Sequence, residues 1–292
     1  MADDALTLIR EAAGHELLGQ DALLDATLSG GGTTTLYSCP ELITWTNDAR
    51  WRQAHLLFWA YSQADQQRRV YSRNGAFGQV QALQPLAAAP AAGAPVLFFR
   101  DFSYSEWLDI LNSTVRALHY DSVVYQRGIS DLYQYSLPTP LSQGGWIREV
   151  FRGEYPTRWT DPQPPGVEWY RLNPLNVVGD IALVLEETLD ADEQLVFHAT
   201  VPFWHGATSA YTMTRSVLTP FGQTDAVSVP RSWLVAGMVW RALVRKTRTL
   251  SGAARAQWQA NTEEAARRYA EQCAAHGVTR VGKRELGFSD RG

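Results

Sequence analysis

Histidine is the side chain most often used for acid–base chemistry and metal binding, but its spacing in this chain favours structural roles. Six histidines are scattered along the sequence, at His15, His55, His119, His198, His205 and His276. No two stand three to five residues apart, the spacing that lets two imidazoles bind one metal ion. His198 and His205 lie seven residues apart, beside Trp204. We interpret them as strand-end or loop histidines with polar partners rather than as a ligand pair.

The acidic residues, cysteines and glycines give no catalytic pattern either. Glu186-Glu187 and residues 190–193 resemble a solvated hairpin tip, whereas a glycosidase needs two carboxylates that face each other across a cleft. Cys273 lies on the apolar stripe of an expected helix, where buried thiols are common. Residues 30–32 are all glycine but lack the Gly-Lys-Ser/Thr of a Walker loop, and no dinucleotide fingerprint or Gly-x-Ser-x-Gly elbow occurs. We therefore expect no enzyme, cofactor or metal site.

Basic side chains give a clearer pattern, because they gather near the end of the chain. Residues 231–292 contain 12 Arg or Lys and 5 Asp or Glu, whereas the whole chain has a net charge of −4. Such asymmetry indicates a surface that meets an acidic partner, or self-association of opposite faces, although solvated charges at a helix end explain it equally well. The candidate interface residues are Arg241, Arg245, Lys246, Arg248, Arg280, Lys283, Arg284 and Phe288.

Tryptophan is abundant, with 11 residues, and such rings can stack on sugars or nucleobases. Four of them fall on expected helix stripes and favour core or subunit contacts instead: Trp107, Trp233, Trp240 and Trp258. Six more have no clear role from the sequence: Trp45, Trp51, Trp146, Trp159, Trp169 and Trp204. A count this high is compatible with an obligate oligomer.

Periodicity and turn signals predict the elements that hold these residues. Residues 3–18 read as a helix, and residues 33–100 as short β-rich runs separated by turns. Ser103-Tyr104-Ser105-Glu106 is a capping box that opens a second helix reaching about His119. A second β-rich stretch covers residues 131–214, and its Pro-rich links are too short for crossover helices.

The last part of the chain reads as two helices, which Gly252 separates and which should pack antiparallel. The order of elements predicts an α+β fold, a helical bundle built from N-terminal, central and C-terminal helices with two antiparallel β insertions. The expected segments are an N-terminal bundle helix (1–25), a small antiparallel β domain (26–100), a central bundle helix (101–121), a second β domain (122–229), a C-terminal helical hairpin (230–276) and a basic tail (277–292).

Composition agrees with a globular chain. The sequence has 292 residues, 45% hydrophobic and 19% charged, which is enough to bury a core without disulfides. No stretch approaches about 18 uncharged apolar residues, so no membrane span is expected. Charges at Asp3, Asp4 and Arg10 interrupt the opening residues, where a signal peptide would be apolar. We expect a soluble protein made in a reducing compartment.

Three stretches of the chain resemble the head-to-tail adaptors, or connectors, of the tailed-bacteriophage neck. Residues 102–112 are similar to the capped adaptor helix with its aromatic, Leu and Asn pattern, and residues 131–138 to the Tyr and Leu-Pro strand that follows it. Residues 230–275 resemble the Ala-, Trp- and Arg-rich helical hairpin that closes these proteins. The Gly-Gly-Thr-Thr-Thr-Leu run at 31–36, with the Ala-Pro loop before Val96, is similar to the β domain of longer members.

The resemblance implies a structural virion protein without catalysis or a cofactor. Such adaptors form a homo-oligomeric ring, commonly of twelve subunits, between portal and tail around the channel that double-stranded DNA crosses. Their partners are the portal protein, sister copies and a downstream neck or tail protein such as a tail terminator or stopper. The DNA passes without sequence-specific recognition, and no membrane is involved. The protein would be made in the host bacterial cytoplasm and reside in the virion neck, with the basic tail and hairpin end facing the portal.

Two other functions stay open from the sequence. The tryptophans and two β stretches are also compatible with a carbohydrate-binding or carbohydrate-cleaving β-sandwich protein, which predicts an exposed aromatic cleft lined with carboxylates. Another tail or baseplate structural protein is the third possibility. The adaptor hypothesis differs from the carbohydrate hypothesis in predicting a large assembly and no turnover of a small molecule.

Overall fold

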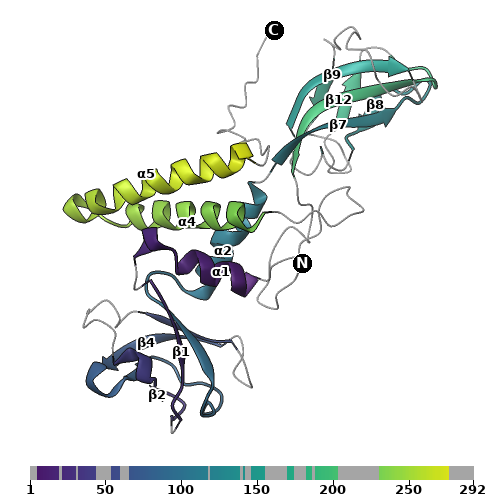
Figure 1. Ribbon diagram of the computed structural model, residues 1–292. Helices are drawn as coiled ribbons and strands as arrows, with labels where there is room; N and C mark the ends of the chain where they lie inside the picture. Colours follow the sequence, from purple (N-terminus) through teal and green to yellow (C-terminus); the bar gives the residue numbers. More distant parts are fainter. Residues whose placement is uncertain are drawn as a thin grey trace. The chain divides into compact units, whose positions relative to one another are not determined.

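The chain divides into two compact units, which are described separately (Figure 1). Unit 1 comprises residues 1–115, 210–218 and 228–272, and unit 2 comprises residues 116–209, 219–227 and 273–292. The computed structural model describes residues 5–19, 22–30, 32–43, 54–59, 66–117, 119–138, 141, 146–154, 170–173, 182–185, 188–202 and 230–275.

Helices and six strands make up unit 1. Its helices are α1 (Ala5–Ala13), α2 (Tyr104–Arg116), α4 (Arg231–Arg248) and α5 (Gly252–Ala275), with short 3-10 helices η1 (Glu16–Leu18), η2 (Pro40–Leu42) and η5 (Gly75–Phe77). Its strands are β1 (Leu23–Thr27), β2 (Leu36–Ser38), β3 (His55–Phe58), β4 (Gln67–Asn74), β5 (Gln79–Ala82) and β6 (Pro95–Phe99).

The strands of unit 1 form one antiparallel sheet in the order β1-β6-β3-β4-β5-β2. The sheet curls, because the Ser29 N–H, just beyond β1, donates to the Ser38 carbonyl on β2 at 2.9 Å and so links its two edges. Its concave side holds a core of its own, in which Tyr37 and Phe58 make an edge-to-face contact with ring centroids 5.4 Å apart. Edge-to-face contact is a preferred aromatic geometry.

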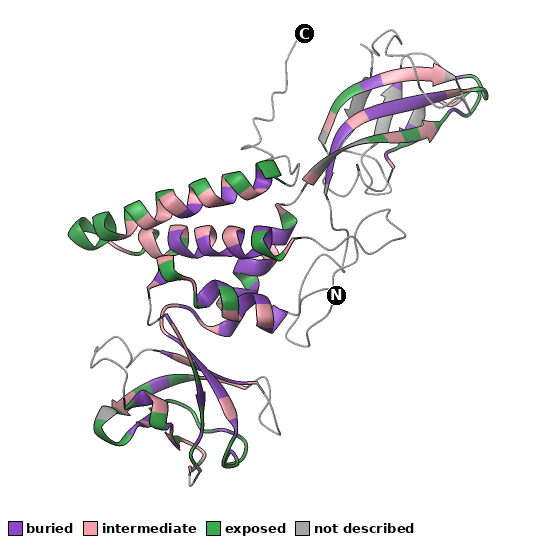
Figure 2. Cartoon of the chain, in the orientation of Figure 1, coloured by how far each residue is buried: buried purple, intermediate pink, exposed green. Residues whose placement is uncertain are grey.

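The helices of unit 1 approach one another closely at Gly237. A Cβ at this position would lie 2.5 Å from Thr114 Cγ2 on α2 and 2.9 Å from the Tyr269 ring on α5, so only glycine allows this packing. Trp233 is fully buried on α4, and its ring lies 5.5 Å from that of Tyr269. Trp240 stacks on the same tyrosine at 5.3 Å. Figure 2 shows the buried faces of these helices.

The capping box predicted for α2 is confirmed. The Ser103 backbone N–H donates to Glu106 Oε2 at 2.7 Å, and the Glu106 N–H donates to Ser103 Oγ at 3.2 Å. These reciprocal bonds satisfy two backbone donors that a helix start leaves unpaired. The stripe that follows is also buried, since Trp107 is 3% exposed and Leu111 is 0% exposed.

Strands also dominate the described part of unit 2. They are β7 (His119–Arg127), β8 (Gln134–Ser136), β9 (Trp146–Glu154), β10 (Tyr170–Asn173), β11 (Ala182–Leu185) and β12 (Glu193–Pro202). They form two three-stranded antiparallel sheets, β7-β12-β9 and β10-β11-β8. Residues of both sheets share one apolar core, which contains Tyr135, Val150, Leu185 and Phe197.

The predicted fold class, a helical bundle with two antiparallel β insertions, is wrong. Twelve strands are described against four α-helices, and the six-stranded sheet of unit 1 is a principal layer with its own core rather than an insertion. Two segments expected to be purely helical also contain strands. Strand β1 begins at Leu23, inside segment 1–25, and β7 begins at His119, inside segment 101–121. The β-branched and aromatic residues of β7 favour a strand as soon as α2 ends.

Among the helices of the described residues, none is both long enough and apolar enough to cross a membrane.

Candidate interaction surface

The hairpin of α4 and α5 carries four of the eight predicted interface residues, Arg241, Arg245, Lys246 and Arg248. The other four lie outside the described residues: Arg280, Lys283, Arg284 and Phe288. The C-terminal turn of α4 contains three of the described cations, where they offset the negative end of the helix dipole. The sequence placed these cations correctly on one helix, but the structure gives them different environments.

The turn between the two helices is short and well defined. The Thr249 backbone N–H donates to the Lys246 carbonyl at 3.2 Å, and Thr249 Oγ1 donates to the same carbonyl at 2.8 Å, which caps α4. Gly252 then begins α5 with φ of +56°, a left-handed conformation that glycine adopts without strain. The residues on both sides of this turn form the exposed end of the hairpin.

The Lys246 side chain is buried within unit 1, where it is paired with a carboxylate. Its Nζ donates to Asp101 Oδ2 at 2.7 Å and lies 3.6 Å from the centroid of the Trp258 ring, and its side chain is only 10% exposed. Arg100 reinforces this cluster, since its guanidinium lies 3.5 Å from Asp101 and donates to the Leu18 carbonyl at 3.1 Å. Lys246 is therefore a structural cation that fastens α4 to the segment before α2.

The remaining cations of α4 differ in exposure. Arg241 is half-buried, with its guanidinium 5.5 Å from the Trp240 ring, whereas Arg245 and Arg248 are exposed. Arg255 is exposed near the start of α5 and was missed as a candidate. The signal that could have found it is the absence of any Asp or Glu from Arg241 to Thr262.

We name Arg245, Arg248 and Arg255 the arginine tip, because they flank the turn between α4 and α5. Within the described part of the chain, no ion pair or hydrogen bond occupies their side chains. The α5 residues around Arg255 are small and exposed: Ala253, Ala254 and Ala256. A partner can therefore reach these guanidinium groups without bulky neighbours in the way. Arginine suits such a role, because its planar fork binds carboxylates in bidentate geometry.

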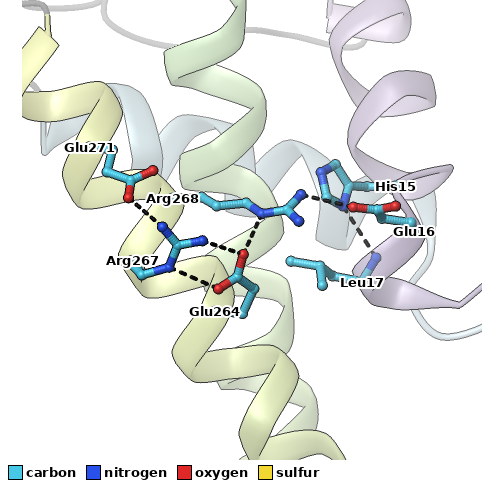
Figure 3. A network of polar contacts seen from close by, with 7 residues as sticks. All are labelled: His15, Glu16, Leu17, Glu264, Arg267, Arg268 and Glu271. Atoms are coloured by element: carbon cyan, nitrogen blue, oxygen red, sulfur yellow. Dashed lines mark hydrogen bonds and ion pairs between the residues drawn. The ribbon is translucent and has the colours of Figure 1, made fainter.

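Farther along α5, the charged side chains are paired (Figure 3). Glu264 accepts hydrogen bonds from Arg267 and Arg268, each with a shortest distance of 2.7 Å. Arg268 also reaches Glu16 of η1 at 2.9 Å, and Arg267 pairs with Glu271. The hydrogen bond from Arg267, followed by that from Arg268, lowers the pKa of Glu264 to about 2. These contacts hold α5 against the segment after α1.

His15 lies beside this network and caps η1 (Figure 3). The Leu17 backbone N–H donates to His15 Nδ1 at 3.3 Å, which requires that nitrogen to be unprotonated. Burial lowers the pKa of His15, and the nearby Arg268 guanidinium lowers it further. The effect of Arg268 on His15 could not be read from the sequence, because the two residues are distant along the chain.

His198 has the polar partner expected from the sequence, but this histidine lies within β12 rather than at a strand end or in a loop. Its Nδ1 lies 3.4 Å from Glu149 Oε2, and its ring lies 5.0 Å from the Phe151 ring, on the sheet β7-β12-β9. This cluster contributes one carboxylate, whereas a glycosidase pair needs two. His205 lies outside the described residues, as do residues 186–187.

The cysteines and tryptophans have structural environments where the structure describes them. Burial raises the pKa of Cys39 to about 12, so its thiol stays protonated, and Cys273 is also buried. Trp107 and Trp233 lie in the core, and Trp258 packs under Lys246. The side chains of the six tryptophans without a clear role lie outside the description. Among the described residues, no group of three His, Cys, Asp or Glu side chains could hold a metal ion.

No protein-family model, curated protein or solved structure matches this chain.

Proposed function

We propose that this protein is a structural virion protein, a head-to-tail adaptor that forms a ring between portal and tail around the DNA channel. Its partners in this proposal are the portal protein, sister copies and a downstream neck or tail protein. Double-stranded DNA passes through the ring without sequence-specific contacts. The observation that carries the proposal is the arginine tip on the hairpin of α4 and α5, the part of the chain that most resembles the portal-facing element of adaptors.

The arginine tip supports docking because its charges are exposed and unused among the described residues. An exposed cluster of one sign speeds association with an oppositely charged surface and orients the encounter. The positive dipole end of α5 and the negative dipole end of α4 meet at the same turn and offset each other, so the arginines themselves supply the positive charge of the tip. The partner surface in this proposal is therefore acidic.

Lys246 is excluded from the proposed docking surface, because a partner cannot reach its buried side chain. Lys246 is paired with Asp101 inside unit 1, so its charge is already neutralised. Arg245, Arg248 and Arg255 remain, and the basic tail at 277–292 follows the same helix along the chain. The tail follows the end of α5 opposite to the turn, so in this proposal it is a separate basic contact on the same chain. Two linked contacts can strengthen binding, because the second becomes intramolecular once the first has formed.

Charge reversal at the arginine tip tests the proposal. The variant Arg245→Glu/Arg248→Glu/Arg255→Glu is mixed with the purified portal ring of the same phage, and binding is followed by light scattering at several salt concentrations. Wild-type chain should bind, and its affinity should fall as salt screens the charges. The variant should bind at least about tenfold more weakly, because each lost contact becomes a repulsion.

Matched variants separate charge from folding. Replacement of the same three arginines by lysine keeps the charge and should retain most of the binding. Arg116→Glu, which reverses another exposed arginine, should bind like wild type. The lysine variant keeps the charge and should alter the free energy of unfolding by less than about 0.5 kcal/mol. The reversals at Arg116, Arg245 and Arg248 should each cost roughly 0.3–1 kcal/mol, because these arginines stand in the last turns of α2 and α4, so circular dichroism checks that each variant is folded. A chain lacking residues 277–292 should also fold but lose docking.

Two results would contradict the proposal. Wild-type chain that does not bind the portal ring under any salt condition would overturn the adaptor role. Full binding by the charge-reversed variant would leave the adaptor role standing but move the contact away from the arginine tip.

A further inference from the structure

Unit 1 has a second exposed surface, which is apolar, in contrast to the charged arginine tip. It lies on the outer face of the sheet at strands β4, β5 and β2, where Figure 2 shows exposed segments. We name it the sheet patch, and its large apolar members are Leu36, Ile43, Tyr71, Phe77 and Leu83, which are between 39% and 69% exposed. Large aliphatic and aromatic side chains exposed together usually mark an interaction site.

Strand register places one end of the sheet patch on three adjacent strands. Leu36 of β2 pairs with Gln81 of β5, and Leu83, two residues farther along, returns to the same face. Tyr71 is the extra residue of a β-bulge between Val70 and Ser72 on β4. A bulge re-aims a side chain, and here it leaves the Tyr71 ring 62% exposed.

The other end of the sheet patch lies at the turn between β4 and β5. Phe77 is the most exposed member, at 69%, and precedes Gly78. A Cβ at Gly78 would lie 3.0 Å from Ile43 Cγ1, so Ile43 sits beside this turn. The two ends are joined along β5 by Gln79 and Gln81, which alternate onto the same face.

The middle of the sheet patch is polar but uncharged. Ser72 Oγ donates to Gln81 Oε1 at 3.2 Å, so this bond uses the amide oxygen of Gln81 and not its N–H donors. An amide carries both donors and acceptors, so it can pair with another copy of itself. The nearest exposed charge on the neighbouring strand is Arg69, whose carbonyl accepts from the Leu83 N–H.

We propose that the sheet patch binds a second copy of this chain through a two-fold contact. In such a contact each surface meets its own image, so a patch with one sign of charge would repel itself, whereas neutral apolar and amide groups are self-complementary. The large apolar members together expose roughly 500 Å², and a stable interface buries about 800 Å² on each partner. Gln79, Gln81 and Ser72, which are partly or fully exposed, add polar area to this surface.

This contact goes beyond the proposed function and does not rest on it. A two-fold contact closes after two copies, whereas ring formation needs a head-to-tail contact between different surfaces. The sheet patch therefore pairs copies independently of the arginine tip.

Analytical ultracentrifugation of the full-length chain tests the pairing. Wild-type chain should form dimers that dissociate on dilution, and Tyr71→Ser/Phe77→Ser should raise the dimer dissociation constant at least about tenfold, because buried aromatic anchors dominate interface affinity. The matched control is Tyr125→Ser/Tyr133→Ser, which removes two aromatic rings that are 49% and 54% exposed on unit 2. The control should dimerise like wild type.

Cross-linking gives a second readout that does not depend on affinity. Gln81 lies at the centre of the sheet patch, so Gln81→Cys should form a disulfide-linked dimer on mild oxidation, whereas Ser130→Cys on unit 2 should not. The native cysteines do not interfere, because Cys39 is 0% and Cys273 is 5% exposed.

A wild-type chain that stays monomeric at high concentration, together with no cross-link at Gln81→Cys, would overturn the proposal and assign the sheet patch to a different partner. Dimers that persist in Tyr71→Ser/Phe77→Ser would also overturn it. Portal binding by the same variants is measured in parallel and should match wild type, so that failure of the pairing is distinguishable from failure of the adaptor role.

Discussion

The turn-proximal end of the hairpin of α4 and α5 and the distal half of α5 are both rich in arginine but use it in opposite ways. In the distal half, Arg267 and Arg268 are held by Glu264, and Arg268 extends to Glu16 on another element. At the arginine tip, the described residues offer Arg245, Arg248 and Arg255 no such partner.

The difference shows that acidic neighbours, rather than the arginines themselves, decide what the charges do. Exposed ion pairs add little to stability, but a network that joins two elements can fix how they meet. Exposed arginines without such a partner do not join elements of the fold, and they stay available to bind another molecule. Lys246 lies among the residues of the arginine tip along the sequence, yet it belongs with the paired group because Asp101 reaches it.

The largest effect should follow removal of the partner of Lys246. In Asp101→Ala, the Lys246 ammonium stays nine-tenths buried without its carboxylate, so the free energy of unfolding should fall by about 3 kcal/mol. Urea denaturation measures this. The double variant Asp101→Ala/Lys246→Met should recover only part of the loss, because it removes the unpaired Lys246 charge but still leaves the buried Arg100 guanidinium without Asp101. An unchanged free energy of unfolding in Asp101→Ala would place Lys246 with the exposed arginines instead.

A smaller effect should appear as a pH dependence at His15. Because its pKa is lowered by burial and by Arg268, the unfolded chain binds the proton first as the pH falls below 6.5. This contribution to the free energy of unfolding is thus present above pH 6.5 and is lost as the pH falls through the lower pKa of the folded state. Denaturation at pH 7.5 and 5.5 measures the slope.

His15→Asn is the matched variant, since asparagine can also accept the Leu17 N–H as a helix cap. It should reduce the slope without abolishing it, because burial and Arg69 also lower the pKa of His55. Glu11 and Glu16 oppose the shift at His15, so adding salt should alter the slope only modestly. A slope identical to that of wild type would show that His15 does not couple to the paired region.

The smallest effect should come from Glu264→Gln. The pKa of Glu264 is lowered to about 2 by Arg267 and Arg268, so its contribution is present above pH 4.5 and is lost as the pH falls toward 2. The stability difference between wild type and variant should therefore be greatest at neutral pH and disappear in acid. Because the pairs are exposed, the difference should be smaller than that of Asp101→Ala. A difference that persists at pH 2 would contradict the pairing as its cause.

Local features of this fold could be predicted from the sequence because they depend on neighbours along the chain. Ser103 and Glu106 predict their own helix start, and the stripe through Trp107 predicts a buried face. The prediction of a helical bundle failed for a different reason. The residues around Leu23 do not indicate that it pairs with Phe99 in a six-stranded sheet. The short strand β1 also lacks a strong alternation of apolar and polar residues.

The candidate surface was predictable in part. The acid-free run from Arg241 to Thr262 indicates a cationic surface from the sequence alone. That Lys246 is withdrawn from this surface could not be read from the sequence, because its partner Asp101 stands 145 residues away. The exposure of Tyr71 also depends on a bulge that only strand pairing defines.

The sequence by itself determined where helices start, where cations gather and which aromatic residues line helix stripes. These properties follow from backbone propensities and from side chains within a few residues of one another. Only the tertiary structure decided which cations are neutralised, which histidine lies beside a distant arginine and which apolar residues remain exposed. Such outcomes depend on groups brought together by long-range packing, where burial and partner distance set the energy of each charge.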